Sequence, residues 1–215
     1  MNKPIEVSYK WTDNLDTIRS WIEQDLKDID IIACDFEVSS KYSKEYLEEV
    51  RTNLETETDW EKKRILERTL ATTGLSHPSL TELTHLSIAW SNHQAMVFII
   101  LDHGIRDYLL DFLVETDKKE IWHNLGFDGK FLLYYKHKLP RNWEDTLLMA
   151  KAYMNHAKNY KCEVGLKALE GHNYGEWAIS KENFNLDEVY KEYMLKYSAT
   201  DACATYNLYM EIIES

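Results

Sequence analysis

The feature that most constrains the fold is a short apolar run that ends in two acids, Ile31-Ile-Ala-Cys-Asp-Phe-Glu-Val38. Its first four residues are uninterrupted apolar side chains, which is typical of a central strand buried on both faces. Asp35 and Glu37 are two residues apart, so on a strand their side chains leave the same face. Two carboxylates on one face of a buried strand carry a desolvation cost that stability alone does not justify. The run therefore predicts a core strand that carries a pair of functional acids.

The remaining chain alternates between helical and strand periodicity. A strand is followed by a charged helical stretch, a pair of strands, a helix, a short strand and then helices to the end. This order predicts an α/β fold, a mixed β-sheet with helices packed on its faces. The expected elements are a helix over 14–26 with Asp13 or Asn14 as N-cap, strands over 83–91 and 94–101 joined by a turn at Asn92-His93, a helix over 104–115, a strand over 119–124, a helix from Gly126 to before Pro140, and helices from Asp145 onward with breaks near Lys158, Gly171 and Asn183.

Residues 40–72 differ in composition from the rest of the chain. They hold eight acids and seven bases and neither proline nor glycine, and their few large apolar residues recur at helical spacing. We expect one or two charged helices that end near Gly74 and Pro78. The chain of 215 residues suits one domain, 1–215, with a charged helical insertion over 40–80 after the first core strand.

Composition narrows the class of protein. A hydrophobic content of 44% and an aromatic content of 13% indicate a globular chain rather than a disordered one. Three cysteines, Cys34, Cys162 and Cys203, are an odd number without paired spacing, which argues against a disulfide framework or a zinc knuckle. The N-terminus lacks the apolar core of a signal peptide, and no apolar run is long enough for a membrane span. We expect no membrane association and a cytoplasmic location, in a bacterial or phage-infected cell.

The formal net charge of −12 argues against tight, sequence-independent binding to long duplex. It is compatible with an enzyme that grips a few nucleotides at one strand end, where metal ions supply the positive charge. Basic residues are in local excess between residues 130 and 167. This excess could follow a phosphate backbone or could be a solvated helix face.

Two further blocks carry acids on helices. Asp128 lies in the first turn of a predicted helix in Trp122-His-Asn-Leu-Gly-Phe-Asp-Gly129, and Asp201 follows Tyr197 by one helical turn. Singly, each block has an ordinary interpretation. Asp128 could be a carboxylate at a helix N-terminus with Asn124 as the cap, and Tyr197 and Asp201 could be a half-buried tyrosine and an exposed acid. Jointly, the acids of the three blocks predict an all-oxygen site suited to Mg²⁺ or Mn²⁺.

The three blocks resemble the Exo I, II and III motifs of the DnaQ-like (DEDD) 3′–5′ exonucleases, which have a ribonuclease H-like fold. His123-Asn-Leu-Gly-Phe-Asp128, with Asp145-Thr146 and Gly165-Leu-Lys-Ala-Leu169, is similar to the proofreading domain of family A DNA polymerases. The resemblance covers roughly residues 28–213. Tyr197, with Lys196 where the other subclass would carry histidine, resembles the DEDDy branch.

The resemblance implies a function and a set of roles. Asp35, Glu37, Asp128 and Asp201 would hold two divalent metal ions, Mg²⁺ or Mn²⁺, and Tyr197 would orient the attacking water. Asn124 and Phe127 would contact the terminal nucleotide. The activity would remove 5′-mononucleotides from the 3′ end of single-stranded or frayed DNA, such as a primer end. That activity would serve proofreading, with a DNA polymerase as partner or as a further module.

Two alternatives remain open at the level of sequence. An exoribonuclease of the RNase D type would share the acids and act on RNA. A catalytically silent nucleic-acid-binding or docking subunit would keep the acids as relics and use the charged stretch as its interface. We expect Asp145 to cap a helix and His123 to be packed and hydrogen-bonded rather than to act in catalysis. The chain would be a stand-alone exonuclease or an excised domain.

Overall fold

The computed structural model describes residues 4–40, 44–64, 78–79, 81–155, 164–175, 177 and 188–215. The chain divides into two compact units. The first unit comprises Met1–Phe36 and His85–Ser215, and the second comprises Glu37–Thr84. Strands β2 (Ile31–Ser40) and β3 (Thr81–Ala89) each contribute residues to both units.

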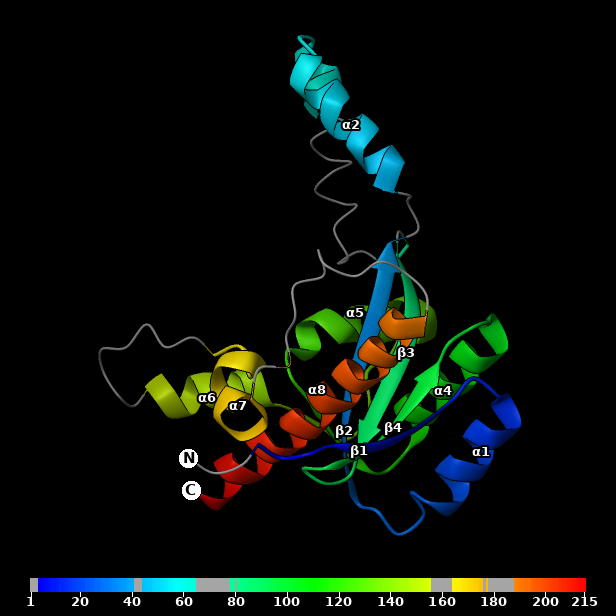
Figure 1. Ribbon diagram of the computed structural model, residues 1–215, viewed down its shortest axis with the longest axis vertical. Helices are drawn as coiled ribbons and strands as arrows, with labels where there is room; N and C mark the ends of the chain where they lie inside the picture. Colours follow the sequence, from blue (N-terminus) through cyan, green and yellow to red (C-terminus); the bar gives the residue numbers. More distant parts are fainter. Residues whose placement is uncertain are drawn as a thin grey trace. The chain divides into compact units, whose positions relative to one another are not determined.

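The strands form one mixed six-stranded sheet in the order β1-β4-β3-β2-β5-β6. β4 pairs antiparallel with β3 and parallel with β1, and β5 pairs parallel with both β2 and β6. In Figure 1 the arrows of β2 and β3 point in opposite directions. The α/β class and the mixed sheet predicted from the sequence are confirmed. The remaining strands are β1 (Ser8–Thr12), β4 (Gln94–Ile99), β5 (Lys119–Trp122) and β6 (Trp143–Asp145).

Within the first unit, β2 is an interior strand whose two faces differ. Ile32, Cys34 and Phe36 are buried, and the Phe36 ring lies 5.4 Å from the ring of Trp122 in β5. The intervening Ala33 packs into a core cluster that includes Leu195 of helix α8 (Glu188–Glu214). Asp35 follows Ala33 by two residues, so its side chain leaves the sheet on the face covered by α8.

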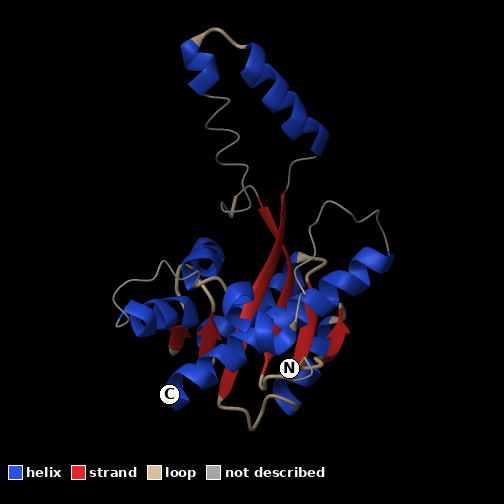
Figure 2. Cartoon of the chain, turned by 60° about the vertical axis from the view of Figure 1, so that its left-hand side comes forward, coloured by secondary structure: helices blue, strands red, loops and turns tan. Residues whose placement is uncertain are grey.

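Helices cover both faces of the sheet in the first unit (Figure 2). On one face α8 runs across the strands (Figure 1), and its small residues Ala199 and Ala202 belong to the same buried cluster as Ala95 of β4. On the other face Trp21 of α1 (Leu15–Gln24) lies 6.3 Å from Phe98 of β4.

Cation–π contacts join the helices of this second layer. Arg19 of α1 lies over Tyr108 of α4 (His103–Glu115), and Arg106 of α4 lies over Tyr135 of α5 (Leu125–Lys136). Two shorter helices, α6 (Thr146–Asn155) and α7 (Leu166–Tyr174), also belong to the first unit. Burial of the sheet between helical layers fixes β2 and α8 as rigid supports for the acids they carry.

The second unit contains α2 (Lys44–Thr56) and the adjoining ends of β2 and β3. The Thr84 hydroxyl donates to the Glu37 carbonyl oxygen at 3.1 Å, so the two strand ends are adjacent within this unit. The helix expected in the charged stretch is present over Lys44–Thr56, whereas residues 65–77 lie outside the described residues. The expected insertion over 40–80 falls within this unit.

The structure differs from the sequence predictions at two edge strands and at the end of one helix. β1 and β6 were not predicted, and α7 continues through Gly171 to Tyr174, so the expected break there was wrong. The helix ends instead at Gly175, whose φ of 72° favours glycine. The breaks expected near Lys158 and Asn183 lie outside the described residues.

Among the described residues, no helix combines the length and apolar character that a membrane crossing needs.

Candidate active site

Three carboxylates from two elements converge beside the sheet. Ligand oxygens of Asp35 and Glu37 on β2 and of Asp201 on α8 all lie within 4.8 Å of one another. Asp201 is 8% exposed, and the other two residues are partly buried. Like charges this close repel one another, so the arrangement favours a cation among them. Oxygen-only donors of this kind match hard divalent ions such as Mg²⁺.

Asp201 has two positively polarised neighbours. The ammonium group of Lys167 in α7 contacts Asp201 Oδ1, and the indole Nε1 of Trp177 donates to the same oxygen at 2.5 Å. The Lys167 Nζ also lies 4.4 Å from the ring centroid of Tyr197 and 4.8 Å from that of Trp177. These contacts hold the Asp201 carboxylate in one orientation and balance part of the local negative charge.

Asp128 is linked to the cluster by a hydrogen bond with the backbone of β2. Its Oδ1 accepts from the Phe36 N–H at 3.3 Å, between the two acids of the strand. It is 4% exposed and lies in the first turn of α5, where the helix dipole stabilises a carboxylate. It is not one of the three carboxylates that lie within 4.8 Å of one another. The structure therefore places the fourth predicted acid next to the cluster rather than inside it.

The turn before α5 is built on Asp145. Asn124 is the N-cap residue of α5, as the ordinary interpretation had it, but it adopts the left-handed region with φ 70° and its side chain makes no capping hydrogen bond. Asp145 instead accepts from the N–H groups of Asn124 and Leu125 at 2.9 and 3.0 Å. It also accepts from the Leu147 N–H in α6 at 2.9 Å. The capping role predicted for Asp145 is confirmed, and it extends to the starts of two helices.

His123 is packed as expected. Its Nδ1 lies 2.9 Å from the Thr146 hydroxyl oxygen, and burial lowers the pKa of its imidazole, an effect that the charge of Asp145 partly opposes. Asn124 is exposed on the adjacent turn. Phe127 is half-buried, with its ring 5.9 Å from that of Phe131. Asn124 and Phe127 are thus placed at the start of α5, next to Asp128.

Tyr197 lies one helical turn before Asp201 on α8 and is half-buried. Its ring centroid is 5.9 Å from that of Tyr193, and Lys167 approaches it from α7. Lys196, the neighbour that distinguished the two subclasses in the sequence, is exposed. Sequence reasoning did not single out Lys167 or Trp177 as neighbours of Asp201. Lys167 lay within the block 165–169, whereas no sequence signal marked Trp177.

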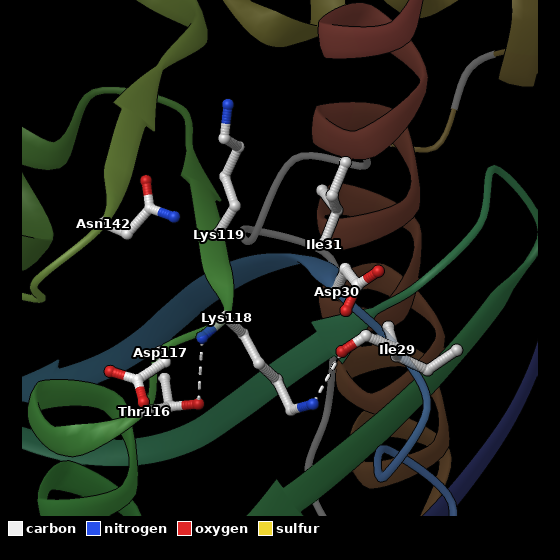
Figure 3. A pocket seen from close by; sticks show the side chains of 8 residues that line it. All are labelled: Ile29, Asp30, Ile31, Thr116, Asp117, Lys118, Lys119 and Asn142. Atoms are coloured by element: carbon white, nitrogen blue, oxygen red, sulfur yellow. Dashed lines mark hydrogen bonds between the residues drawn. The ribbon is translucent and has the colours of Figure 1, made fainter.

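A hollow of about 480 Å³ lies at the opposite end of the parallel strands (Figure 3). Its walls come from the segments that lead into β2 and β5, among them Ile29 and Lys118. The Lys118 ammonium donates to the carbonyl oxygens of Leu26 and Ile29, both at 2.6 Å, so it serves to tie these segments together. The hollow lies at the start of β2, at Ile31, whereas Asp35 and Glu37 lie four and six residues further along the strand. We therefore assign this hollow no part in the site.

A family model described as 3′–5′ exonuclease matches residues 72–214. The match includes Asp128 and Asp201 and begins after Asp35 and Glu37. No curated protein matches the sequence.

Solved structures share the fold at low sequence identity. Brucella melitensis NrnC, which has been solved with bound Mg²⁺ and bound to pGG, is 16% identical with a TM-score of 0.54; the alignment covers 99% of this chain and 81% of NrnC. Escherichia coli RNase D is 14% identical with a TM-score of 0.59, over 97% of this chain and 45% of RNase D. Pol1 from M. smegmatis is 10% identical with a TM-score of 0.56, over 96% of this chain and 27% of Pol1.

These similarities confirm the expected ribonuclease H-like, DnaQ-like fold. The family match covers well over half of the sequence and includes the helices that carry Asp128 and Asp201. The chain therefore belongs to the 3′–5′ exonuclease family, whose members are hydrolases.

Proposed function

We propose that this chain is a metal-dependent 3′–5′ exonuclease of the DEDDy type. It removes 5′-mononucleotides from the 3′ end of single-stranded or frayed DNA. The main support for the proposal is that carboxylate oxygens of Asp35, Glu37 and Asp201 lie within 4.8 Å of one another, with Tyr197 one turn before Asp201 on the same helix. Action on a mismatched primer end would be proofreading, with a DNA polymerase as the partner or as a further module.

The acids fit a divalent metal site because three carboxylates converge at a partly buried position. Asp35, Glu37 and Asp201 would hold one ion, and Asp35 and Asp128 would contribute to a second. When bound, such ions lower the pKa of water and stabilise the negative charge that develops on the phosphate. No side-chain base is then required, which agrees with a site built from acids and one tyrosine.

The remaining side chains orient the substrate and the ligands. The Tyr197 hydroxyl would hold the attacking water in line with the scissile bond. Lys167 and Trp177 keep the Asp201 carboxylate in place through their contacts with Oδ1. Asn124 and Phe127, at the start of α5, would contact the terminal nucleotide.

An exoribonuclease is the second candidate. RNase D and NrnC share the fold as closely as Pol1 does, and NrnC has been solved bound to pGG. The similarity in fold supports both substrates equally. Matched DNA and RNA oligonucleotides of one sequence, digested under the same conditions, separate the two candidates by rate.

Asp201→Asn tests the proposed activity. The variant keeps the shape of the side chain but removes the charge, so Mg²⁺-dependent shortening of a 5′-labelled oligonucleotide should fall by at least about 100-fold. Gel analysis of timed reactions, with and without chelator, measures the loss, and circular dichroism checks the fold. Glu214→Gln, at the exposed end of the same helix, is the control and should be fully active. An Asp201→Asn variant with near wild-type activity would contradict the proposal.

Tyr197→Phe tests the DEDDy assignment. The variant loses one hydrogen bond worth about 1.4 kcal/mol, so kcat should fall roughly tenfold while the affinity for metal stays unchanged. Single-turnover rates and a calorimetric Mn²⁺ titration measure the two quantities. A fully active Tyr197→Phe variant would show that the tyrosine does not orient the water.

A further inference from the structure

An exposed tryptophan begins a second helical segment in the second unit. A short loop, 57–59, joins α2 to this segment, whose described part covers residues 60–64 (Figure 2). Trp60 is 67% exposed, more than any other tryptophan among the described residues. A single exposed apolar side chain is ordinary on a protein surface, so the residues around Trp60 decide whether it has a role.

The loop before Trp60 is held by two acids. Glu57 Oε1 accepts from the next two backbone N–H groups along the chain, both at 2.9 Å. Asp59 Oδ1 accepts from the N–H groups of Glu61 and Lys62 at 2.9 and 3.3 Å, which caps the helical segment. These bonds fix the backbone on either side of Trp60. The indole is therefore held at a defined place on the surface without being packed into a core.

Two basic residues flank Trp60 on one face of the segment. Lys63 and Arg64 follow it by three and four residues, the spacing at which helical side chains are neighbours, and both are exposed. Glu61 lies outside the arc that these three residues span, and Lys62 lies on the opposite side of the helix. We call Trp60, Lys63 and Arg64 the Trp60 face. It combines an exposed ring with a positive charge on each side.

A ring between two positive charges suits single-stranded nucleic acid. A base of any identity stacks on the ring, and the charges attract the adjoining phosphates. Lysine, in contrast, is depleted where proteins bind one another. The chain as a whole carries a formal charge of −12, so a polyanion needs a local basic contact of this kind to bind. The Trp60 face therefore fits a nucleic-acid strand better than the surface of another protein.

We propose that the Trp60 face binds the substrate strand at nucleotides upstream of its 3′ end. The proposal rests on the proposed exonuclease function, which brings the 3′ end to the acids and leaves the rest of a longer strand available. A base stacks on Trp60, and Lys63 and Arg64 hold the neighbouring phosphates. Stacking and phosphate contacts accept any base sequence, as the successive removal of nucleotides from one strand requires.

The direct test is fluorescence anisotropy of the full chain with a labelled DNA strand of about 20 nucleotides, longer than one binding site, in chelator to prevent cleavage. Trp60→Ala should weaken binding at least about fivefold, and Trp60→Phe, which keeps a ring, should recover most of the affinity. Tyr153→Ala removes an exposed tyrosine of α6 and is the matched control. Circular dichroism checks that all three variants fold. A Trp60→Ala variant that binds the strand normally would overturn the proposal and favour a protein partner.

The salt dependence of binding tests the two charges. Each phosphate contact with a single strand contributes about 0.7 to the slope of log Kd against log salt concentration. Lys63→Gln and Arg64→Gln should each lower the slope by about this amount. Lys62→Gln removes the same charge from the opposite side of the helix and should leave the slope unchanged. If it lowered the slope as much as the other two variants, the attraction would be diffuse and the Trp60 face would not be the site.

Cleavage of strands of different length tests the upstream position. With Mg²⁺, Trp60→Ala should raise the KM for the longer strand at least about fivefold, because a stacked base is lost, and leave kcat unchanged. Cleavage of a dinucleotide should match the wild type, since so short a substrate has no upstream nucleotides. An equal loss on the dinucleotide would overturn the upstream assignment.

The two proposals can fail separately. A chain that cleaves oligonucleotides, but whose Trp60→Ala variant binds the longer strand normally, contradicts only the Trp60 face. A chain that binds the strand through Trp60 but cleaves no oligonucleotide contradicts the exonuclease function.

Discussion

Glu120 shows how this fold holds a carboxyl group away from water. The residue is fully buried in β5, and its Oε2 accepts from the Trp122 indole at 3.1 Å. Its Oε1 has no hydrogen-bond partner among the described residues. Burial raises the pKa of this carboxyl to about 9, while the indole hydrogen bond opposes the rise. At neutral pH the folded protein therefore holds Glu120 in the protonated form.

This raised pKa makes stability depend on pH. The unfolded chain releases the Glu120 proton above its ordinary pKa of 4.5, whereas the folded chain keeps it until about pH 9. The folded state thus binds more protons in this window, and the free energy of unfolding falls as pH rises through it. Glu120→Gln removes the titrating group and should be more stable than the wild type. The advantage should grow by on the order of 4 kcal/mol from pH 5 to pH 8, since the two states differ by nearly one proton over these three pH units and each unit is worth about 1.4 kcal/mol.

Urea denaturation at the two pH values measures this difference. Glu23→Gln, an exposed acid in α1, is the control and should follow the wild type at both. If the gap between wild type and Glu120→Gln were the same at pH 5 and pH 8, Glu120 would not be the buried acid responsible.

The sequence predicts the positions of some site residues but not their contacts with one another. Asp35 and Glu37 follow from the two-residue period of a strand, and Asp201 follows Tyr197 by one helical turn, so the faces they occupy were predictable. The contacts of Asp201 with Lys167 and Trp177 could not be predicted from the sequence, because they join residues 34 and 24 positions apart. Such contacts depend on how α7 and Trp177, which follows it, pack against α8, and the local periodicity of the sequence does not record this packing.

At the scale of elements, the central strands and long helices were predictable and the edge strands were not. β2, β3 and β4 carry apolar runs that mark buried strands. β1 is a five-residue edge strand of mixed polarity, defined by its parallel pairing with β4. β6 has three residues and, among the described strands, pairs with β5 alone. Pairing with a neighbour, rather than propensity, makes these two segments strands.

Asp145 links several elements around the site. It ends β6, and its carboxylate accepts from the first N–H groups of α5 and from α6. The helix start that carries Asp128 is therefore fixed by a residue 17 positions later in the chain. The sequence predicted that Asp145 caps a helix; that it also orients α5 follows only from the packing of β6 beside β5.

At the scale of the whole molecule, the described residues of the cluster around α8 all come from Met1–Phe36 and His85–Ser215, as do α1, α4 and α5 on the other face. The family match begins at residue 72, after most of the charged stretch. Within the second unit, the contact between Thr84 and the Glu37 carbonyl shows that the strand ends are close enough for a short connection.

Replacing residues 41–80 with a short Gly-Ser linker should therefore leave a folded protein. The melting temperature, followed by circular dichroism, should stay within a few degrees of the full chain, because the buried cluster of the first unit is retained. Cleavage of a short oligonucleotide should also persist, since the four acids and Tyr197 all lie outside the replaced segment. Weaker activity on longer strands alone would assign the segment to substrate binding, and unchanged activity on every length would favour a docking role. A shortened protein that unfolds, or that fails on short oligonucleotides, would show that the charged stretch is part of the catalytic fold.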